Sequence, residues 1–198
     1  MKIEKQEIGI VLLAAGAGKR FGGNKLSAYV DEEKMYVRAM NLIAAQPNVN
    51  SVVVVTGNEE IADEAKKRSM GVAWNIHPEI GISRSIRLGI EKILKTSSKI
   101  DGIMFMVSDQ PWIQKETIRN MLDGFNGGIF ALRYEGCPGN PVIFSKSYFS
   151  ELMELTGDVG GRQVMKRHEK DIYYLEALNE KELRDIDRRE QLIEQEDL

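Results

Sequence analysis

The stretch LLAAGAGKRFGGNK, residues 12–25, contains the strongest indication of the fold. It overlaps the end of a short apolar run at residues 8–13, which is typical of a buried strand. Four glycines and three cations, Lys19, Arg20 and Lys25, then replace the apolar residues. Glycine lets the backbone turn sharply and approach a ligand, and open N–H groups beside cations favour a polyphosphate. The stretch therefore predicts a phosphate-binding loop after the first strand, where open α/β sheets bind ligands.

Two common phosphate loops do not fit this stretch. A Walker loop requires Gly, four residues, Gly, Lys and then Ser or Thr; Gly18 and Gly23 have the glycine spacing, but Asn24 stands at the lysine position. A dinucleotide fingerprint requires Gly-x-Gly-x-x-Gly; Gly16 and Gly18 fit, but Phe21 stands at the third glycine. A flexible loop with solvated charges is the simpler alternative.

Length, composition and charge limit the classes of protein that this chain can represent. Its 198 residues are 42% hydrophobic and 29% charged, which is ordinary for a globular protein, and we expect one domain over residues 1–198. A net charge of −3 argues against a general binder of nucleic acid or of anionic membranes. No apolar run approaches the ~20 residues of a membrane span. The single cysteine, Cys137, excludes an intrachain disulfide, and we expect a cytoplasmic protein.

Apolar periodicity predicts helices and strands that alternate along the chain. Residues 35–45 are predicted to form a helix, and four consecutive valines within residues 51–56 are typical of a strand buried on both faces. A charged helix at residues 59–70 and a short strand at 72–75 follow, so the order predicts a doubly wound α/β fold. The later predicted elements are strands at residues 103–107, 128–133, 142–144 and 172–177, and helices from residue 83 and at 114–125, 146–155, 162–168 and within 188–198.

Residues 78–89, PEIGISRSIRLG, contain the start of the third predicted helix. Gly81 lies just before that start, where open N–H groups can meet an anion or the edge of a base. Ser83 and Ser85 follow within the first turn. The simpler alternative is that one of these serines only caps the helix.

Asp109 lies two residues after the end of a predicted strand, within the sequence SDQP at residues 108–111. A carboxylate at the carboxyl end of a central strand points into the ligand crevice of a doubly wound sheet. Magnesium prefers such hard oxygen ligands, and it usually takes one or two carboxylates and completes its shell with phosphate and water. The alternative is that Asp109 only opens a turn.

Residues 12–25 closely resemble the signature of the nucleotidyltransferase family, Leu-Ala-Ala-Gly-x-x-x-Arg followed by Gly-x-x-Lys. Within the branch related to molybdopterin-guanine-dinucleotide synthase, the stretch looks most like the molybdenum cofactor cytidylyltransferases. The resemblance implies a three-layer α/β/α sandwich around a mostly parallel, doubly wound sheet, as in nucleotide-diphospho-sugar transferases. It also implies that Arg20 and Lys25 hold the triphosphate and the charge that develops on it.

Residues 81–89 have the pattern Gly-x-Ser-x-Ser-Ile-Arg-x-Gly, which resembles the second nucleotide-contacting motif of the cytidylyltransferases. The guanylyltransferases typically have a Gly-Pro-Leu-Ala-Gly segment at this place, so the resemblance favours CTP over GTP. The nucleotide-binding residues that it implies are Leu13, Ala14, Ala15, Gly16, Gly18, Arg20, Lys25, Gly81, Ser83 and Ser85.

The family resemblance also implies a metal site. The sequence around Asp109 resembles an Asp-x-Pro element whose aspartate binds the metal, and residues 185–187, Asp-Ile-Asp, resemble an element whose second acid, Asp187, completes the site. A solvated acidic stretch is the alternative for residues 185–187. The resemblance thus implies Arg20, Lys25 and Asp109 as catalytic residues and Asp109 and Asp187 as ligands of Mg²⁺.

Two further stretches are expected to contact the phosphate acceptor. Residues 134–141 are predicted to form a long, turn-rich connection; the family has a Gly-His-Pro element here, and Asn140 replaces its histidine. Asparagine exchanges hydrogen bonds but carries no proton, and a plain surface hairpin is the alternative. Residues 157–162 resemble a Gly-Asp-x-Gly-x-Arg element that can bind an anion at a helix start. The implied acceptor-binding residues are Asn140, Pro141, Asp158, Gly160 and Arg162.

The reaction that these residues fit is nucleotidyl transfer, in which a phosphate attacks the α-phosphorus of a nucleoside triphosphate and pyrophosphate leaves. Such a reaction depends on alignment and charge neutralisation, and it needs no general base. By resemblance, the acceptor is molybdopterin, the cofactor is Mg²⁺ and the protein partner is a molybdoenzyme or its chaperone. The alternatives are a GTP-using or sugar-phosphate nucleotidyltransferase, and a non-catalytic nucleotide-binding or cofactor-delivery protein.

Overall fold

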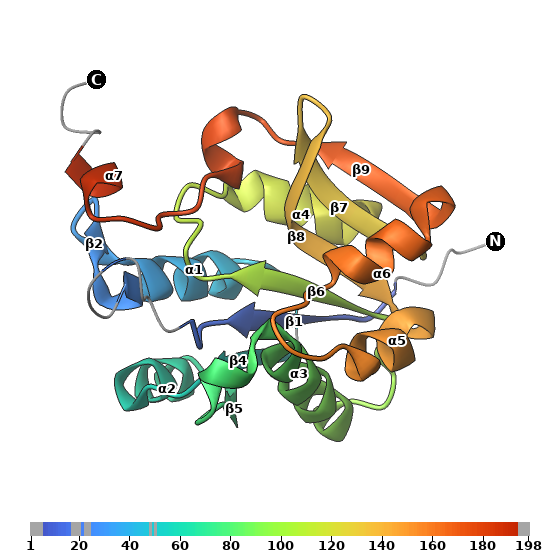
Figure 1. Ribbon diagram of the computed structural model, residues 1–198, viewed down its shortest axis with the longest axis horizontal. Helices are drawn as coiled ribbons and strands as arrows, with labels where there is room; N and C mark the ends of the chain where they lie inside the picture. Colours follow the sequence, from blue (N-terminus) through green and yellow to red (C-terminus); the bar gives the residue numbers. More distant parts are fainter. Residues whose placement is uncertain (1–5, 17–20, 22–24, 48, 50, 194–198) are drawn as a thin grey trace.

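A computed structural model describes residues 6–16, 21, 25–47, 49 and 51–193 of the protein. Seven strands form one sheet in the order β5-β4-β1-β6-β8-β7-β9 (Figure 1). Neighbouring strands are parallel except at β8, which runs antiparallel to both β6 and β7. The strands of this sheet are β1 (Ile8–Leu13), β4 (Val52–Thr56), β5 (Gly71–Trp74), β6 (Gly102–Val107), β7 (Ile129–Tyr134), β8 (Cys137–Ser145) and β9 (Ile172–Glu176).

Helices cover both faces of this sheet, and β4 shows why its valine run suits that position. Val54 packs into one hydrophobic cluster with residues of α1, α2 and α4, whereas Val53 and Val55 pack into a second cluster with residues of α3, α5 and α6. The fold is therefore the predicted three-layer α/β/α sandwich. The α-helices are α1 (Met35–Ala44), α2 (Glu59–Lys67), α3 (Ile82–Thr96), α4 (Lys115–Gly124), α5 (Phe149–Glu154), α6 (Arg162–Arg167) and α7 (Glu190–Ile193), and the 3-10 helices are η1 (Lys25–Ser27), η2 (Pro78–Ile80), η3 (Lys146–Tyr148), η4 (Glu169–Asp171) and η5 (Glu180–Leu183).

The connection through α3 determines where a ligand can bind on this sheet. The chain winds outward from β1 through β4 to β5, and α3 then brings it back to β6 on the other side of β1. Leu13 and Val107, the last residues of β1 and β6, are paired across the sheet. Ligands of doubly wound folds bind where the strand order reverses in this way, outside the carboxyl ends of the strands.

The predicted long connection at residues 134–141 is wrong. The structure has a tight turn at Glu135 and Gly136, whose φ angles are 47° and 81°, and β8 begins directly after it. The prolines of β8 had suggested a turn. Their missing N–H groups are tolerated because this part of β8 extends beyond β6, whose pairing with β8 ends at Val142, and so has a free side.

Two smaller differences lie near the first helices. An antiparallel hairpin of β2 (Tyr29–Val30) and β3 (Glu33–Lys34), which was not predicted, precedes α1. Helix α2 ends at Lys67, three residues before its predicted end. Within the part of the chain that the structure describes, no helix has the length and apolar composition needed to cross a membrane.

Candidate functional site

A cleft of about 770 Å³ opens at the carboxyl ends of β1 and β6. Leu13 and Val107 form part of its floor, and the segments that follow these strands form part of its walls. The residues that line it and were predicted as site residues are Leu13, Ala15, Gly16, Lys25, Gly81, Ser85, Asp109, Asp158 and Asp187. Two others, Gly18 and Arg20, lie outside the described residues. The structure thus brings the described ends of the predicted phosphate loop, the start of α3 and the two predicted metal ligands to one cleft.

Lys25 lies between the two carboxylates that were predicted to bind a metal. Its ammonium donates a hydrogen bond to Asp109 Oδ2 at 2.8 Å and another to Asp187 Oδ1 at 2.7 Å. Only 9% of the Lys25 side chain is exposed, compared with 28% for Asp109 and 51% for Asp187. Burial lowers the pKa of Lys25, but the two carboxylates outweigh burial and leave the pKa raised. The ammonium is therefore charged, and the two carboxylates already converge on one cation.

This donor set fits a magnesium ion. No group of three or more His, Cys, Asp or Glu residues able to hold a metal occurs among the described residues. Magnesium does not require one, because it is commonly held by one or two carboxylates with phosphate oxygens and water completing its shell. Asp109 and Asp187 supply those two carboxylates, and the Lys25 ammonium marks the position of a positive charge between them.

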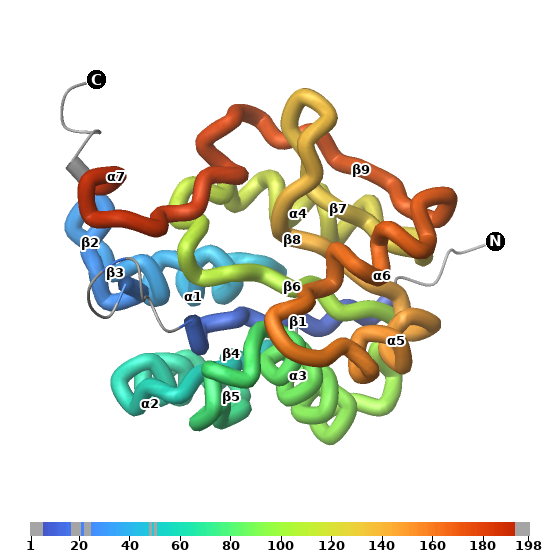
Figure 2. The backbone as a smooth tube through the Cα atoms, in the orientation of Figure 1, coloured from blue at the N-terminus to red at the C-terminus, as the bar shows by residue number. Residues whose placement is uncertain are grey.

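The C-terminal segment owes its place beside Asp109 to Ile186. The backbone N–H of Ile186 donates to the carbonyl oxygen of Asp109 at 3.0 Å, and its side chain is fully buried against Phe21, Val30 and Met35. Figure 2 shows the chain crossing the molecule after β9, from the right of the view to α7 at the left, next to β2. Since one side chain of the Asp-Ile-Asp sequence is buried, its neighbour Asp187 is directed into the cleft.

The two serines at the start of α3 have different surroundings. Ser85 lines the cleft and accepts a hydrogen bond of 2.9 Å from the amide of Asn75, which is fully buried. Ser83 does not line the cleft; its hydroxyl donates to the carbonyl oxygen of Gly157 at 2.7 Å. Gly81 is the N-cap of α3, and no side chain caps the helix, so the capping alternative is wrong for both serines. Ala14, another predicted nucleotide contact, is buried and also lies outside the cleft lining.

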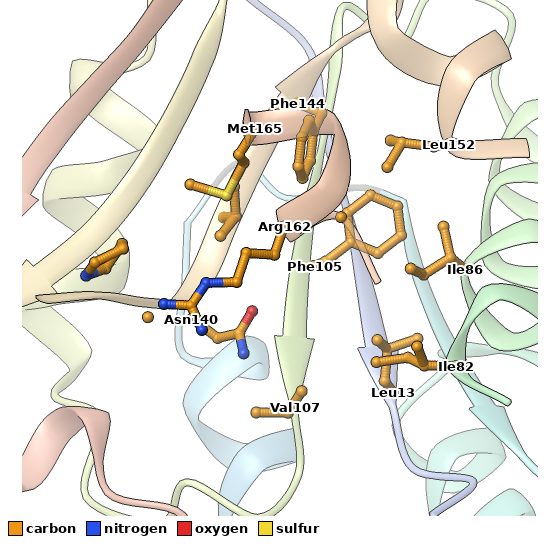
Figure 3. Close-up of a pocket in the computed structure, with 14 residues that line it drawn as sticks. Leu13, Ile82, Ile86, Phe105, Val107, Asn140, Phe144, Leu152, Arg162 and Met165 are labelled. Carbon is orange, nitrogen blue, oxygen red and sulfur yellow. The ribbon is translucent and has the colours of Figure 1, made fainter. Parts of the chain in front are cut away.

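A second, smaller pocket of about 150 Å³ adjoins the cleft and shares Leu13, Ile82 and Val107 with it (Figure 3). Most of its remaining walls are apolar and come from α3, β6, β8, α5 and α6; they include Ile86, Phe105, Val142, Phe144, Leu152 and Met165. Asn140 and Arg162 are its polar residues, and Figure 3 shows them on the side opposite Leu13 and Ile82. The Arg162 side chain forms no hydrogen bond or ion pair with any residue that the structure describes. Pro141 and Gly160 line neither pocket.

Comparisons with known proteins identify the family. A model described as "MobA-like NTP transferase domain" matches residues 10–172. The chain belongs to this family. The MobA-like chain is 29% identical over 193 residues to purine catabolism protein PucB of Bacillus subtilis (strain 168). This alignment covers 89% of this chain and 90% of PucB.

Solved structures share the fold of this MobA-like protein. Rv0371c from Mycobacterium tuberculosis H37Rv is 23% identical, with a TM-score of 0.73 and coverage of 88% of this chain and 89% of Rv0371c. The nucleotidyl transferase Mth528 from Methanothermobacter thermautotrophicus is 20% identical, with a TM-score of 0.77 and coverage of 96% of each chain. The family and the fold together make this chain a protein of the nucleotidyltransferase type.

The cleft of this MobA-like chain contains acidic groups that the sequence patterns did not indicate. Its described lining carries one ammonium, that of Lys25, and four carboxylates; three of them belong to predicted site residues, and the fourth, that of Glu79, does not. Asp185 lies close by: surrounding protein atoms raise the pKa of its carboxyl, and the charges of Asp109 and Asp187 raise it further. Sequence reasoning assigned no role to either Asp185 or Glu79: Asp185 is the first acid of the Asp-Ile-Asp element, of which only the second acid was interpreted, and Glu79 lies outside the motifs that resemble the family. So acidic a lining repels a triphosphate unless further cations bind with it.

Proposed function

We propose that this protein is a Mg²⁺-dependent nucleotidyltransferase that joins CMP from CTP to the phosphate of molybdopterin and releases pyrophosphate. The observation that carries the proposal is the convergence of Asp109 and Asp187 on one cation, in the cleft at the switch point of a MobA-like fold. Two carboxylates beside a lysine, at the edge of a sheet that binds ligands, provide what phosphoryl chemistry needs.

Nucleotidyl transfer requires that the acceptor phosphate be aligned with the α-phosphorus and that the negative charge of the phosphates be neutralised. An oxygen of the acceptor phosphate attacks the α-phosphorus; the bond to the bridging oxygen of the β-phosphate breaks, and pyrophosphate leaves with that electron pair. A phosphate monoester has a second pKa of about 6, so the nucleophile is already an anion at neutral pH and no base is required. No histidine is among the described residues that line the cleft, which agrees with such a mechanism.

The residues of the chain then have distinct tasks. Asp109 and Asp187 would hold Mg²⁺, which supplies positive charge to the phosphate oxygens when bound. Lys25 would exchange its two carboxylate partners for oxygens of the triphosphate, and Arg20 would contribute a second cation there. Groups of this kind each account for about 10²- to 10³-fold in rate.

The start of α3 supports CTP as the nucleotide. Gly81 and Ser85 both line the cleft that contains Lys25 and Asp109, so the stretch that resembles the cytidylyltransferases lies at the same site as the phosphate-binding elements. Buried Asn75 orients the Ser85 hydroxyl through its side-chain amide. Backbone N–H groups at the start of a helix suit an anion or the edge of a base.

The adjoining pocket supports an acceptor that combines a ring system with a phosphate. Its apolar walls would contact a ring, and the guanidinium of Arg162, which has no partner among the described residues, suits a phosphate. A bare sugar phosphate or alditol phosphate would leave those walls without an apolar partner, which disfavours that alternative. Asn140 orients the acceptor by hydrogen bonds and carries no proton, and the product passes to a molybdoenzyme or its chaperone.

The proposal is tested by measuring pyrophosphate release with Mg²⁺, each of CTP, GTP, ATP and UTP, and either molybdopterin or a sugar phosphate. We expect release with CTP and molybdopterin, and a 10²- to 10³-fold slower reaction for Asp109→Asn. Asp63→Asn, on the exposed face of α2, is the matched control and should keep the full rate. Release with GTP or with a sugar phosphate would replace the proposed substrates, and nucleotide binding without release for any acceptor would favour an accessory protein.

A further inference from the structure

We propose that Ser83 and Arg87 hold the loop at residues 155–161 against helix α3, and that Ser83 is thus a positioning residue for the acceptor and not a nucleotide contact. The loop joins α5 to α6 and runs along α3 in Figure 1. This inference rests on the proposed function, in which the loop brings Asp158 to the cleft and leads into Arg162 of the adjoining pocket.

The contact at Ser83 is specific and buried. Its hydroxyl donates to the carbonyl oxygen of Gly157 at 2.7 Å, and its backbone N–H donates to the same oxygen at 3.3 Å. Both serines are buried, with 2% of Ser83 and 6% of Ser85 exposed, but only Ser85 lines the cleft. The N–H groups at the start of a helix have no partner within the helix, and here the loop carbonyl satisfies one of them.

Gly81 lets the loop come this close. Its φ angle of 105° is in the region that glycine adopts readily and other residues avoid. A Cβ atom at Gly81 would collide with the carbonyl group of Gly157 and with the backbone nitrogen of Asp158. The glycine is thus required by the backbone conformation and by the packing of the loop on the start of α3.

Arg87 forms a second attachment one helical turn after Ser83. Its Nε donates to the carbonyl oxygen of Met153 and its Nη2 to that of Leu155, both at 3.2 Å. Residues four apart lie on the same side of a helix, whereas Ser85, two residues from each, points elsewhere. On helix α3, Ser85 therefore faces the cleft that would bind the nucleotide, whereas Ser83 and Arg87 face the loop at residues 155–161.

The test separates the two sides of α3 by measuring the dissociation constant of CTP and the KM of molybdopterin. For Ser83→Ala we expect the KM of molybdopterin to rise about 5-fold, the effect of one lost neutral hydrogen bond, with the CTP dissociation constant unchanged within 2-fold. Arg87→Met should act in the same direction. Ser85→Ala is the matched control on the same helix, and it should weaken CTP binding with little effect on the KM of molybdopterin.

Hydrogen exchange supplies a readout that needs no turnover. Amides at residues 155–161 should exchange faster in Ser83→Ala than in the wild type, and Ser85→Ala should leave them unchanged. If Ser83→Ala does not fold, hydrogen exchange at residues 155–161 is compared between Arg87→Met and the wild type instead. Weaker CTP binding with unaltered loop exchange would overturn the inference and make Ser83 a nucleotide contact. If the wild type releases no pyrophosphate with any substrate pair, the proposed function fails, and the exchange data still decide whether Ser83 positions the loop.

Discussion

Replacing Lys25 by methionine should strengthen binding of a divalent metal to the nucleotide-free protein while it slows the reaction. Methionine keeps much of the length of the lysine stem and removes its charge. In the structure, the Lys25 ammonium occupies the space between Asp109 and Asp187, so a metal ion that binds there before the nucleotide must displace it. Once CTP is bound, the same ammonium would be needed on the triphosphate.

The size of the effect follows from the two hydrogen bonds of 2.8 and 2.7 Å. A hydrogen bond to a charged group contributes ~1.5–3 kcal/mol, and partial exposure of the carboxylates lowers each contribution here to ~1 kcal/mol. Removing about 2 kcal/mol of competition corresponds to roughly 30-fold tighter metal binding. Loss of the cation from the reacting phosphates should slow turnover by about 10²- to 10³-fold.

The assay titrates the protein with Mn²⁺ and follows the free ion by electron paramagnetic resonance, without nucleotide; turnover is measured separately as pyrophosphate release. Lys66→Met, in an exposed ion pair on α2, is the control and should alter neither quantity. Metal affinity that stays the same or falls in Lys25→Met would show that the ammonium does not compete for this position, and full turnover would remove Lys25 from the reaction.

Three further predictions concern other parts of the site and its support. Ile186→Ala removes a fully buried side chain, so it should lower the free energy of unfolding by ~2–4 kcal/mol in urea denaturation and weaken Mn²⁺ binding, because Asp187 loses its anchor. Arg162→Gln should raise the KM of molybdopterin about 10-fold and leave the CTP dissociation constant unchanged. A larger CTP dissociation constant with an unchanged KM of molybdopterin would show that Arg162 contacts the nucleotide and not the acceptor. Burial and the hydrogen bond to Asp171 raise the pKa of Tyr148 to about 12, so its contribution of about 3 kcal/mol is complete below pH 10 and is lost as the pH rises through 12. The difference in unfolding free energy between wild type and Tyr148→Phe should therefore shrink over that pH range, and a constant difference would refute the assignment.

Much of the sheet could be predicted because the relevant signals are local. Val53, Val54 and Val55 of β4 are buried on both faces of the sheet, and an apolar run without polar residues is what such a strand requires. The loop after β1 and the acid after β6 were predicted to face one crevice, because parallel strands that flank a switch point end at the same edge of the sheet. The described part of that loop and Asp109 do line one cleft.

Other features depend on contacts between residues that are far apart in the sequence, and local sequence patterns do not predict such contacts. Ser83 was interpreted as a nucleotide contact because it stands in a motif, but its partner is a carbonyl 74 residues away. The prolines of β8 indicated a turn, and only the free side of that strand beyond β6 makes them acceptable. Asp185 belongs to no predicted role, and its proximity to Asp109 arises from the burial of Ile186.

The most direct test is a crystal structure of the protein with Mn²⁺ and a CTP analogue that cannot transfer its nucleotide, in which the anomalous signal locates the metal. We expect one ion bound by both Asp109 and Asp187, next to the phosphates, with the Lys25 ammonium on a phosphate oxygen instead of between the carboxylates. An ion bound away from both aspartates, or a triphosphate outside the cleft at the ends of β1 and β6, would contradict this expectation.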